Sequence, residues 1–197
     1  PKKGSSMVLV LLLALSAAIT SISASHSYLE IKPGYFFMLN EPEKSILHNG
    51  GADVGVELGT DIFCYLRLGL EARFFGKTGT ALNTCCKNTK LRISSLTPWL
   101  KFIMPAVHGI RPYVGVGPQI QWVRTYNNSP YVQRYQHAAT PASVYTLGLQ
   151  CTYNHLFIDP FVQFQTGKAY FNPSCASVTY PVSTRGIKVG CGVGYTF

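Results

Sequence analysis

The sequence predicts an all-β protein: an antiparallel, up-and-down transmembrane β-barrel of about eight strands, preceded by a cleaved secretory signal peptide. Apolar residues alternate with polar or small residues at period two along most of the chain. Connections between these segments are alternately short and long. Hydrophobic residues make up 47% of the chain and charged residues only 13%, about half the charged share of a soluble domain. Strands with one apolar and one polar face, in this composition, are typical of a barrel surrounded by lipid.

Residues 1–25 have the features of a secretory signal peptide. Lys2 and Lys3 precede the apolar run 7–15, and small residues follow as far as Ser25. This run is shorter than the roughly 20 residues that a membrane-spanning helix requires. We therefore expect cleavage near Ala24 or Ser25, a barrel domain over residues 26–197, and a formal charge that falls from +9 to +7. The alternative is an uncleaved anchor.

The expected strands differ in how strictly they alternate. The last is the clearest, because Val189, Val193 and Tyr195 alternate with small or polar residues until the chain stops at Phe197. Such alternation puts apolar side chains on one face of a strand and has no helical period. In chain order, the expected strands cover residues 29–39, 54–58, 66–74, 96–104, 113–122, 144–153, 158–165 and 187–197.

Three prolines fall inside these segments, in the outward phase: Pro33, Pro98 and Pro118. Proline removes a hydrogen bond from a sheet, and a closed barrel has no edge strand to receive it. We therefore expect bulges or local kinks at these positions.

The connections predict an orientation. Short turns are expected at residues 60–62, 105–109 and 154–155, and long loops at 40–50, 77–90, 126–141 and 169–184. Transmembrane barrels have short periplasmic turns and long extracellular loops. Both termini should then lie on the periplasmic side.

The final stretch Gly192-Val193-Gly194-Tyr195-Thr196-Phe197 resembles the terminal strand of the small, eight-stranded outer-membrane β-barrel proteins of Gram-negative-type bacteria. Residues 31–37 also resemble the first strand of such proteins. The resemblance covers nearly the whole mature chain and implies an outer-membrane location. It also implies that Val193, Tyr195 and Phe197 form the signal that the barrel-assembly machinery reads.

The inward phase should carry a polar network. Six Lys or Arg residues and five carboxylates, Glu30 and Asp53 among them, fall in this phase, whereas Asp61 is expected in a turn. Opposite charges that pair across a narrow lumen would block it; a narrow conducting path is the alternative. The expected lumen residues are Lys32, Glu57, Arg67, Glu71, Arg73, Lys101, Arg111, Gln119, Asp159 and Lys188.

The outer rim should be basic. Nine cations and only two carboxylates, Glu41 and Glu43, fall in the long loops or at the adjoining strand ends. Such a rim suits the phosphates of outer-membrane lipid, including lipopolysaccharide, since Lys and Arg bind phosphate well; the alternative is an ordinary solvated loop surface. The cations are Lys44, Lys77, Lys87, Lys90, Arg92, Arg124, Arg134, Lys168 and Arg185.

The cysteines and histidines point to no enzyme. Either Cys85 or Cys86 could form a disulfide with Cys175 in an oxidising envelope. The other three cysteines, Cys64, Cys151 and Cys191, are expected in strands as small apolar side chains. No zinc spacing or phosphate loop occurs, and the five histidines fall near the mature start or in loops and turns. We expect no catalytic residue, metal, cofactor or nucleic-acid partner, and a monomer.

Two functions follow from the pattern. The first is an integral outer-membrane barrel with a structural, surface-interaction or narrow-transport role. The second is a secreted soluble barrel that binds a hydrophobic ligand, in which the apolar phase would face inward. An envelope lipid-modifying enzyme would require a His on a strand beside a Ser and a carboxylate, and none is found.

Overall fold

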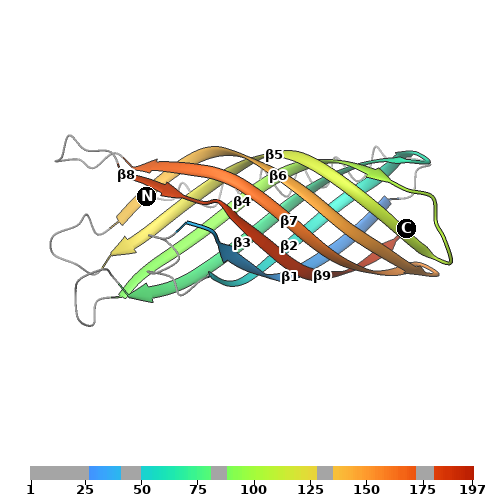
Figure 1. Cartoon of the computed structure of the whole chain (residues 1–197), viewed down its shortest axis with the longest axis horizontal. Helices are drawn as coiled ribbons and strands as arrows, with labels where there is room; N and C mark the ends of the chain where they lie inside the picture. The colour runs from blue at the N-terminus through green and yellow to red at the C-terminus, as the bar shows by residue number, and fades with distance from the viewer. Residues whose placement is uncertain (1–26, 41–49, 81–87, 128–134, 172–179) are drawn as a thin grey trace.

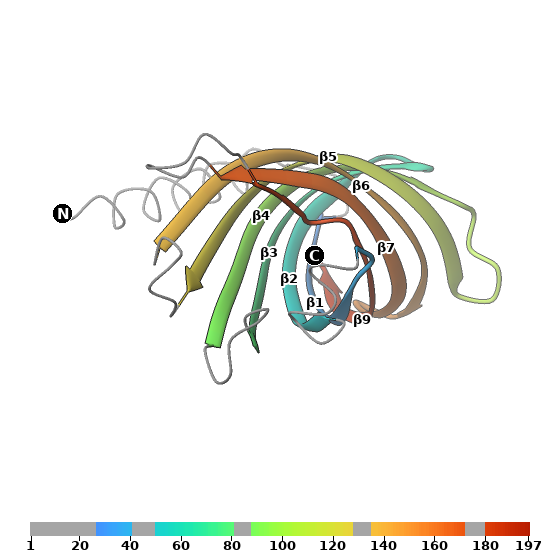
Figure 2. The ribbon, with the colours of Figure 1, turned by 60° about the vertical axis from the view of Figure 1, so that its left-hand side comes forward.

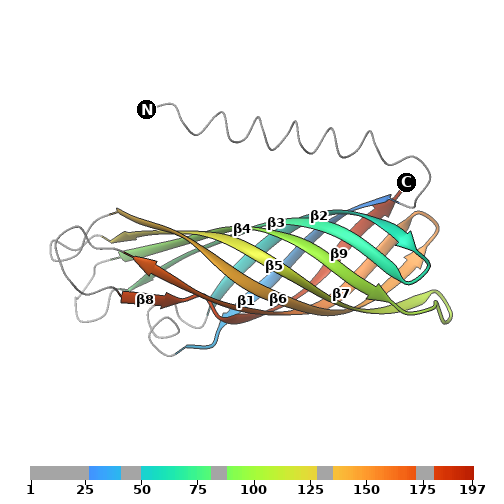
Figure 3. The ribbon, with the colours of Figure 1, turned by 90° about the horizontal axis from the view of Figure 1, so that it is seen from above.

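The computed structural model describes residues 27–40, 50–80, 88–127, 135–171 and 180–197. These residues form a closed antiparallel barrel whose strands cross its long axis obliquely (Figures 1 and 3). The strands are β1 (Ser27–Met38), β2 (Gly50–Phe63), β3 (Leu66–Thr80), β4 (Asn88–Ile103), β5 (Ile110–Asn127), β6 (Tyr135–Tyr153), β7 (Leu156–Phe171), β8 (Tyr180–Ser183) and β9 (Gly186–Thr196). In the described part of the chain, no helix is long and apolar enough to cross a membrane.

Eight strands close the barrel, as the sequence predicts. Strands β1 to β7 each pair with the next, and β9 pairs with both β7 and β1 (Figure 2). The ninth strand, β8, continues β9 along β7: the pairs Lys168–Ser183 and Gln165–Gly186 keep one register. The Thr184 N–H donates to the Gly167 carbonyl (3.1 Å) between them. Thus β8 and β9 are one barrel strand with a short interruption.

The turn between β2 and β3 lies later than predicted. β2 continues through Asp61 to Phe63, the register shifts between these two residues, and the turn falls at Cys64 and Tyr65. Such a bulge inserts one extra residue into a strand and lets pairing resume. Asp61 therefore lies in a strand and not in a turn, and Cys64 lies in a turn and not in a strand. The turns predicted at 105–109 and 154–155 are present.

The strands also extend further at the opposite end than predicted. β3 and β4 stay paired as far as Thr80 and Asn88, and β5 and β6 as far as Tyr126 and Tyr135. His137 is therefore in β6 rather than in a loop. Beyond the apolar band both faces of a strand are free to be polar, so hydrogen bonding continues where the alternation of hydrophobicity fades.

Of the bulges or local kinks predicted at the three prolines, the structure shows no bulge. Pro98 and Pro118 lie opposite each other, and the β4–β5 pairing lapses between Leu96–Ile120 and Leu100–Val116 without a register shift. The β1–β9 pairing likewise lapses at Pro33 and keeps its register. The missing N–H groups remove individual hydrogen bonds, and the intact pairing on either side holds the register.

The burial pattern is that of a barrel with an apolar exterior. Along β9, Val189, Val193 and Tyr195 are exposed, whereas Lys188 is fully buried. The same alternation holds in β1, β3, β5 and β7. A soluble ligand carrier would need the reverse arrangement, with the apolar phase inside. Phe36, Phe75 and other apolar side chains do pack inside the barrel, in a cluster with Met38, Leu91, Ile93, Val123, Ala169 and Phe171.

Candidate functional site

The lumen is filled by polar and charged side chains from all round the barrel. All ten lumen residues that the sequence predicts lie on the inner face of the strands. Nine of them are buried, and the side chain of Arg111 is 28% exposed. The structure joins most of them, with further side chains, into hydrogen-bonded clusters.

The first cluster is centred on Glu57 of β2. Lys32 donates to its Oε2 atom at 3.0 Å, and Lys101 and the Tyr28 hydroxyl both donate to Oε1. The ammonium group of Lys101 also lies over the ring of Tyr113, 4.9 Å from its centroid. Two buried cations thus depend on one carboxylate for their hydrogen-bonded ion pairs.

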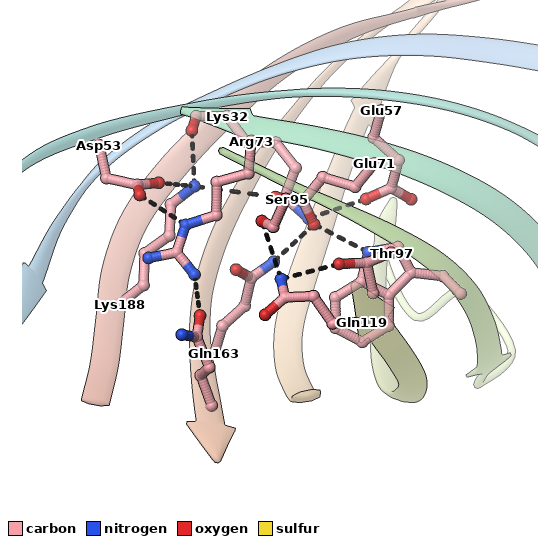
Figure 4. A network of polar contacts seen from close by, with 12 residues as sticks. Lys32, Asp53, Glu57, Glu71, Arg73, Ser95, Thr97, Gln119, Gln163 and Lys188 are labelled. Carbon is pink, nitrogen blue, oxygen red and sulfur yellow. Dashed lines mark hydrogen bonds and ion pairs between the residues drawn. The ribbon is translucent and has the colours of Figure 1, made fainter. Parts of the chain in front are cut away.

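A second cluster joins side chains from β2, β3 and β9. Arg73 and Lys188 both contact the carboxylate of Asp53, at 2.5 and 2.6 Å. Figure 4 shows these three side chains together. Lys188 also donates to the Lys32 carbonyl (3.0 Å), beside the gap in pairing at Pro33. A lumen cation therefore supplies a hydrogen bond to the strand backbone at the proline.

Glu71 of β3 extends this cluster across the lumen. Its Oε2 atom accepts hydrogen bonds from Trp99 Nε1 (2.8 Å) and Gln163 Nε2 (3.0 Å), from β4 and β7. Lys188 lies 3.8 Å from the other carboxylate oxygen. Since β3 and β7 lie across the barrel from each other, these contacts close the space between them.

Neutral and mixed clusters occupy other parts of the lumen. Gln119 donates to Ser95 (3.1 Å) and to Thr97 (2.9 Å), and both of these belong to β4. Towards the short turns, Arg67 contacts Asp61 at 2.5 Å and Gln150 at 3.3 Å. Two further contacts of this region are Arg111–Asp61 at 3.9 Å and Tyr113–Asp159 at 2.6 Å.

All six lumen cations form ion pairs within the lumen, and four of the six lumen carboxylates are their partners. The sequence predicts six cations and five carboxylates inside, because it places Asp61 in a turn. The structure brings Asp61 onto the inner face, where it pairs with Arg67, so six carboxylates face six cations. Pairing of this kind is necessary because an isolated charge is very costly to bury.

Sequence reasoning missed several lumen residues. Tyr28 and Trp99 are fully buried there, and aromatic side chains fill the space that glycines leave on neighbouring strands. A Cβ atom on Gly194 would lie 2.0 Å from the Phe157 ring, and one on Gly148 would lie 2.5 Å from the Tyr113 ring. The glycines of the inward phase are a usable signal, since several of them make room for a large side chain opposite.

The predicted terminal signal lies on the outer face. Val193, Tyr195 and Phe197 are all exposed, and the rings of the last two are 5.4 Å apart. The Phe197 N–H donates to the Ser27 carbonyl (2.8 Å), which joins the chain end to β1.

The described rim cations are exposed except for Lys77, which is partly buried. Arg185 lies over the Phe164 ring, 5.7 Å from its centroid. Lys44, Lys87, Arg134, Glu41 and Glu43 lie outside the described residues, as do residues 1–26.

Three of the six cysteines lie in the part of the chain that the structure describes. Cys85, Cys86 and Cys175 lie outside the described residues, so the candidate disulfide stays a prediction. Cys151 and Cys191 are on strands and exposed. Across the described ranges, no group of three or more His, Cys, Asp or Glu residues is placed to hold a metal ion.

No protein-family model matches the chain, and no curated protein sequence does either. Solved structures do match it. Neisserial surface protein A has a TM-score of 0.55 at 11% identity, over 89% of this chain and 98% of its own. The outer-membrane protein AlkL has a TM-score of 0.56 at 13% identity, over 89% and 93%. Ail of Yersinia pestis, in complex with the heparin analogue sucrose octasulfate, has a TM-score of 0.51 at 13% identity, over 89% and 100%.

These similarities agree with the geometry. The matched proteins are outer-membrane barrels, and each match covers 89% of this chain. At such low identity the likeness concerns the fold alone. The chain therefore has the fold of the small, eight-stranded outer-membrane β-barrel proteins, and this likeness supports an outer-membrane location.

Proposed function

We propose that the chain is an integral outer-membrane protein with a structural or surface-interaction role, without catalytic activity. One observation carries this proposal: an apolar exterior surrounds a lumen of paired charges. Residues 1–25 act as the cleaved signal peptide. Both ends of the mature chain and the short turns face the periplasm, and the long connections face outward, as in other transmembrane barrels.

The lumen contacts support a barrel whose lumen is blocked by side chains. Clusters around Glu57, Asp53 and Glu71 connect strands from opposite sides, and an apolar cluster containing Phe36 and Phe75 packs inside the same barrel. Barrels of eight strands have interiors just wide enough for side chains. Through-flow of hydrated ions would require these contacts to separate.

We expect purified protein to produce no stable conductance steps in a planar lipid bilayer. The physical reason is that paired side chains occupy the path that water and ions would need. A large porin that is reconstituted in parallel provides the control for insertion. Reproducible steps that disappear in Glu71→Gln would show that the lumen conducts.

The exposed cations of the rim are suited to bind anionic groups at the cell surface. Lys90, Arg92, Arg124, Lys168 and Arg185 are exposed around it. Lys and Arg form charge-assisted hydrogen bonds with phosphate and sulfate oxygens. The Ail structure contains a sulfated heparin analogue, which shows that a barrel of this fold can bind a polyanion. The partners proposed for this chain are lipid phosphates, including those of lipopolysaccharide.

The terminal strand is proposed as the signal for the barrel-assembly machinery. We expect Phe197→Asp to accumulate as an unassembled, protease-sensitive species that an alkaline carbonate wash extracts from membranes. The Phe197 backbone contact with Ser27 closes the barrel next to exposed aromatic rings, and a carboxylate would face lipid there. Phe197→Tyr keeps an aromatic terminus and serves as the control. Normal carbonate-resistant levels of Phe197→Asp would contradict the proposal.

A further inference from the structure

A row of cationic and titratable side chains crosses β4, β5 and β6 on the outer face of the barrel. Arg92 of β4 lies directly opposite Arg124 of β5, and Arg124 lies directly opposite His137 of β6. All three side chains are exposed. Lys90 extends the row from the position two residues before Arg92. Side chains directly opposite each other on neighbouring strands have Cβ atoms about 4.5–5.5 Å apart, so they can share one ligand.

This row has no carboxylate partner among the described residues. Every described Asp and Glu faces the lumen, where most of them pair with lumen cations. On β3, the residue opposite Arg92 is Gly76, and the space beside this glycine is open. Like charges directly opposite each other on a sheet repel and destabilise it. An anion bound between Arg92 and Arg124 would remove this repulsion.

The row lies at the boundary of the apolar band. The next outward pair along β4 and β5 is Ser94 and Trp122, followed by Leu96 and Ile120. The outward residues from Leu96 to Met104 are apolar, so residues 96–104 form nine positions of band, with Ser94 between them and Arg92. A tilted strand of about 9–11 residues crosses the hydrocarbon of a bilayer. The arginine pair therefore lies at headgroup depth, beside a tryptophan of the type that marks such interfaces.

The same residues line a pocket. Its volume is about 780 Å³, and its lining includes Lys90, Arg92, Trp122, Arg124 and His137. On the far side of Arg124, the rings of Tyr126 and Tyr135 have centroids 5.0 Å apart. The pocket thus combines cations with aromatic surface. A ligand with an anionic head and an apolar body fits this combination better than a free ion does.

We propose that Lys90, Arg92 and Arg124 bind a phosphate group of a phosphorylated glycolipid in the outer leaflet, with its acyl chains along the apolar face below Trp122. Arginine suits this role because its planar guanidinium group forms two parallel hydrogen bonds to phosphate. The site rests on the proposed function, since it requires this end of the barrel to lie in the outer leaflet.

The test uses the mature barrel, folded in detergent micelles, and native mass spectrometry to count retained lipid. The probes are bisphosphorylated lipid A, the same lipid after removal of its phosphates, and phosphatidylglycerol. We expect the parent to retain bisphosphorylated lipid A, and to bind the other two probes at least tenfold more weakly. The variant R92Q/R124Q should lose at least tenfold in affinity for lipid A. The control variant K168Q/R185Q removes the same charge from other rim cations at the same end, and should lose much less affinity than R92Q/R124Q does.

Several outcomes would overturn the site. They are equal losses in the two double variants, equal binding of the dephosphorylated lipid or of phosphatidylglycerol, and full displacement by millimolar inorganic phosphate. Heat-modifiable migration in gel electrophoresis checks that each variant folds. Failure of the proposed function would look different, since the parent itself would be extracted from membranes by carbonate. A parent that resists extraction but shows no preference for lipid A would contradict the lipid site alone.

Discussion

Glu57→Gln is expected to lower the free energy of unfolding by about 3–5 kcal/mol, because it breaks two buried ion pairs at once. Glu57 is the shared partner of Lys32 and Lys101, and all three side chains are buried at 0–2% exposure. A glutamine can still accept a hydrogen bond, but it cannot balance two ammonium groups. The measurement is reversible urea unfolding of the refolded barrel in lipid vesicles, followed by tryptophan fluorescence.

Two further variants make this test specific. Arg111→Gln removes a lumen cation whose side chain is partly exposed and whose contact with Asp61 is 3.9 Å long, so it should cost less than about 1 kcal/mol. Adding Lys101→Met to Glu57→Gln removes one of the two cations that have lost their carboxylate partner. The double variant should therefore recover part of the lost free energy of unfolding. If Glu57→Gln unfolded within 1 kcal/mol of the parent, the buried ion pairs would not hold the lumen together.

The sequence predicts the faces of the strands well because a single physical rule governs them. In the apolar band, lipid lies on one side and a narrow polar interior on the other, so period two is nearly strict. Arg67 and Glu71 alternate with Leu68 and Leu70, and the structure buries the first two and exposes the others. Strand existence and side-chain direction therefore follow from local pattern alone.

The contacts inside the lumen do not follow from local pattern. Glu57 meets Lys32 from β1 and Lys101 from β4, and these positions come together only through the stagger and tilt of the closed barrel. Asp61 reaches the lumen only because a bulge delays the turn after it. Both features depend on how strands far apart in sequence are arranged, which single-strand alternation does not encode.

In the outer half of the barrel, the sequence pattern fails to predict side-chain direction for a different reason. Phe36 and Phe75 point inward but stand beside outward apolar residues, Phe37 and Phe74. Neighbouring apolar residues on both faces of a strand hide the alternation, so the apolar cluster inside the barrel could not be predicted. In the outer parts of β4 and β5 the pattern is reversed, because apolar Ile93 and Val123 point inward beside the outward Arg92 and Arg124, so the apolar phase no longer marks the lipid-facing side.

Val116→Arg is expected to destabilise the barrel in lipid vesicles by about 2–4 kcal/mol, the cost of a central charge on a lipid-facing strand. Val116 is 45% exposed and lies between Leu100 of β4 and Tyr145 of β6, which are also exposed. Its place in the middle of the apolar band leaves an arginine side chain far from either headgroup region. Urea unfolding in vesicles measures the effect.

Ala106→Arg is the matched control, because Ala106 is exposed in the short turn between β4 and β5, beyond the apolar band. We expect its stability to stay within about 0.5 kcal/mol of the parent. In a soluble barrel both positions would face water, and both substitutions would be nearly neutral. A large loss at Val116 alone requires lipid around the middle of the barrel, whereas equal, small effects at the two positions would contradict membrane insertion.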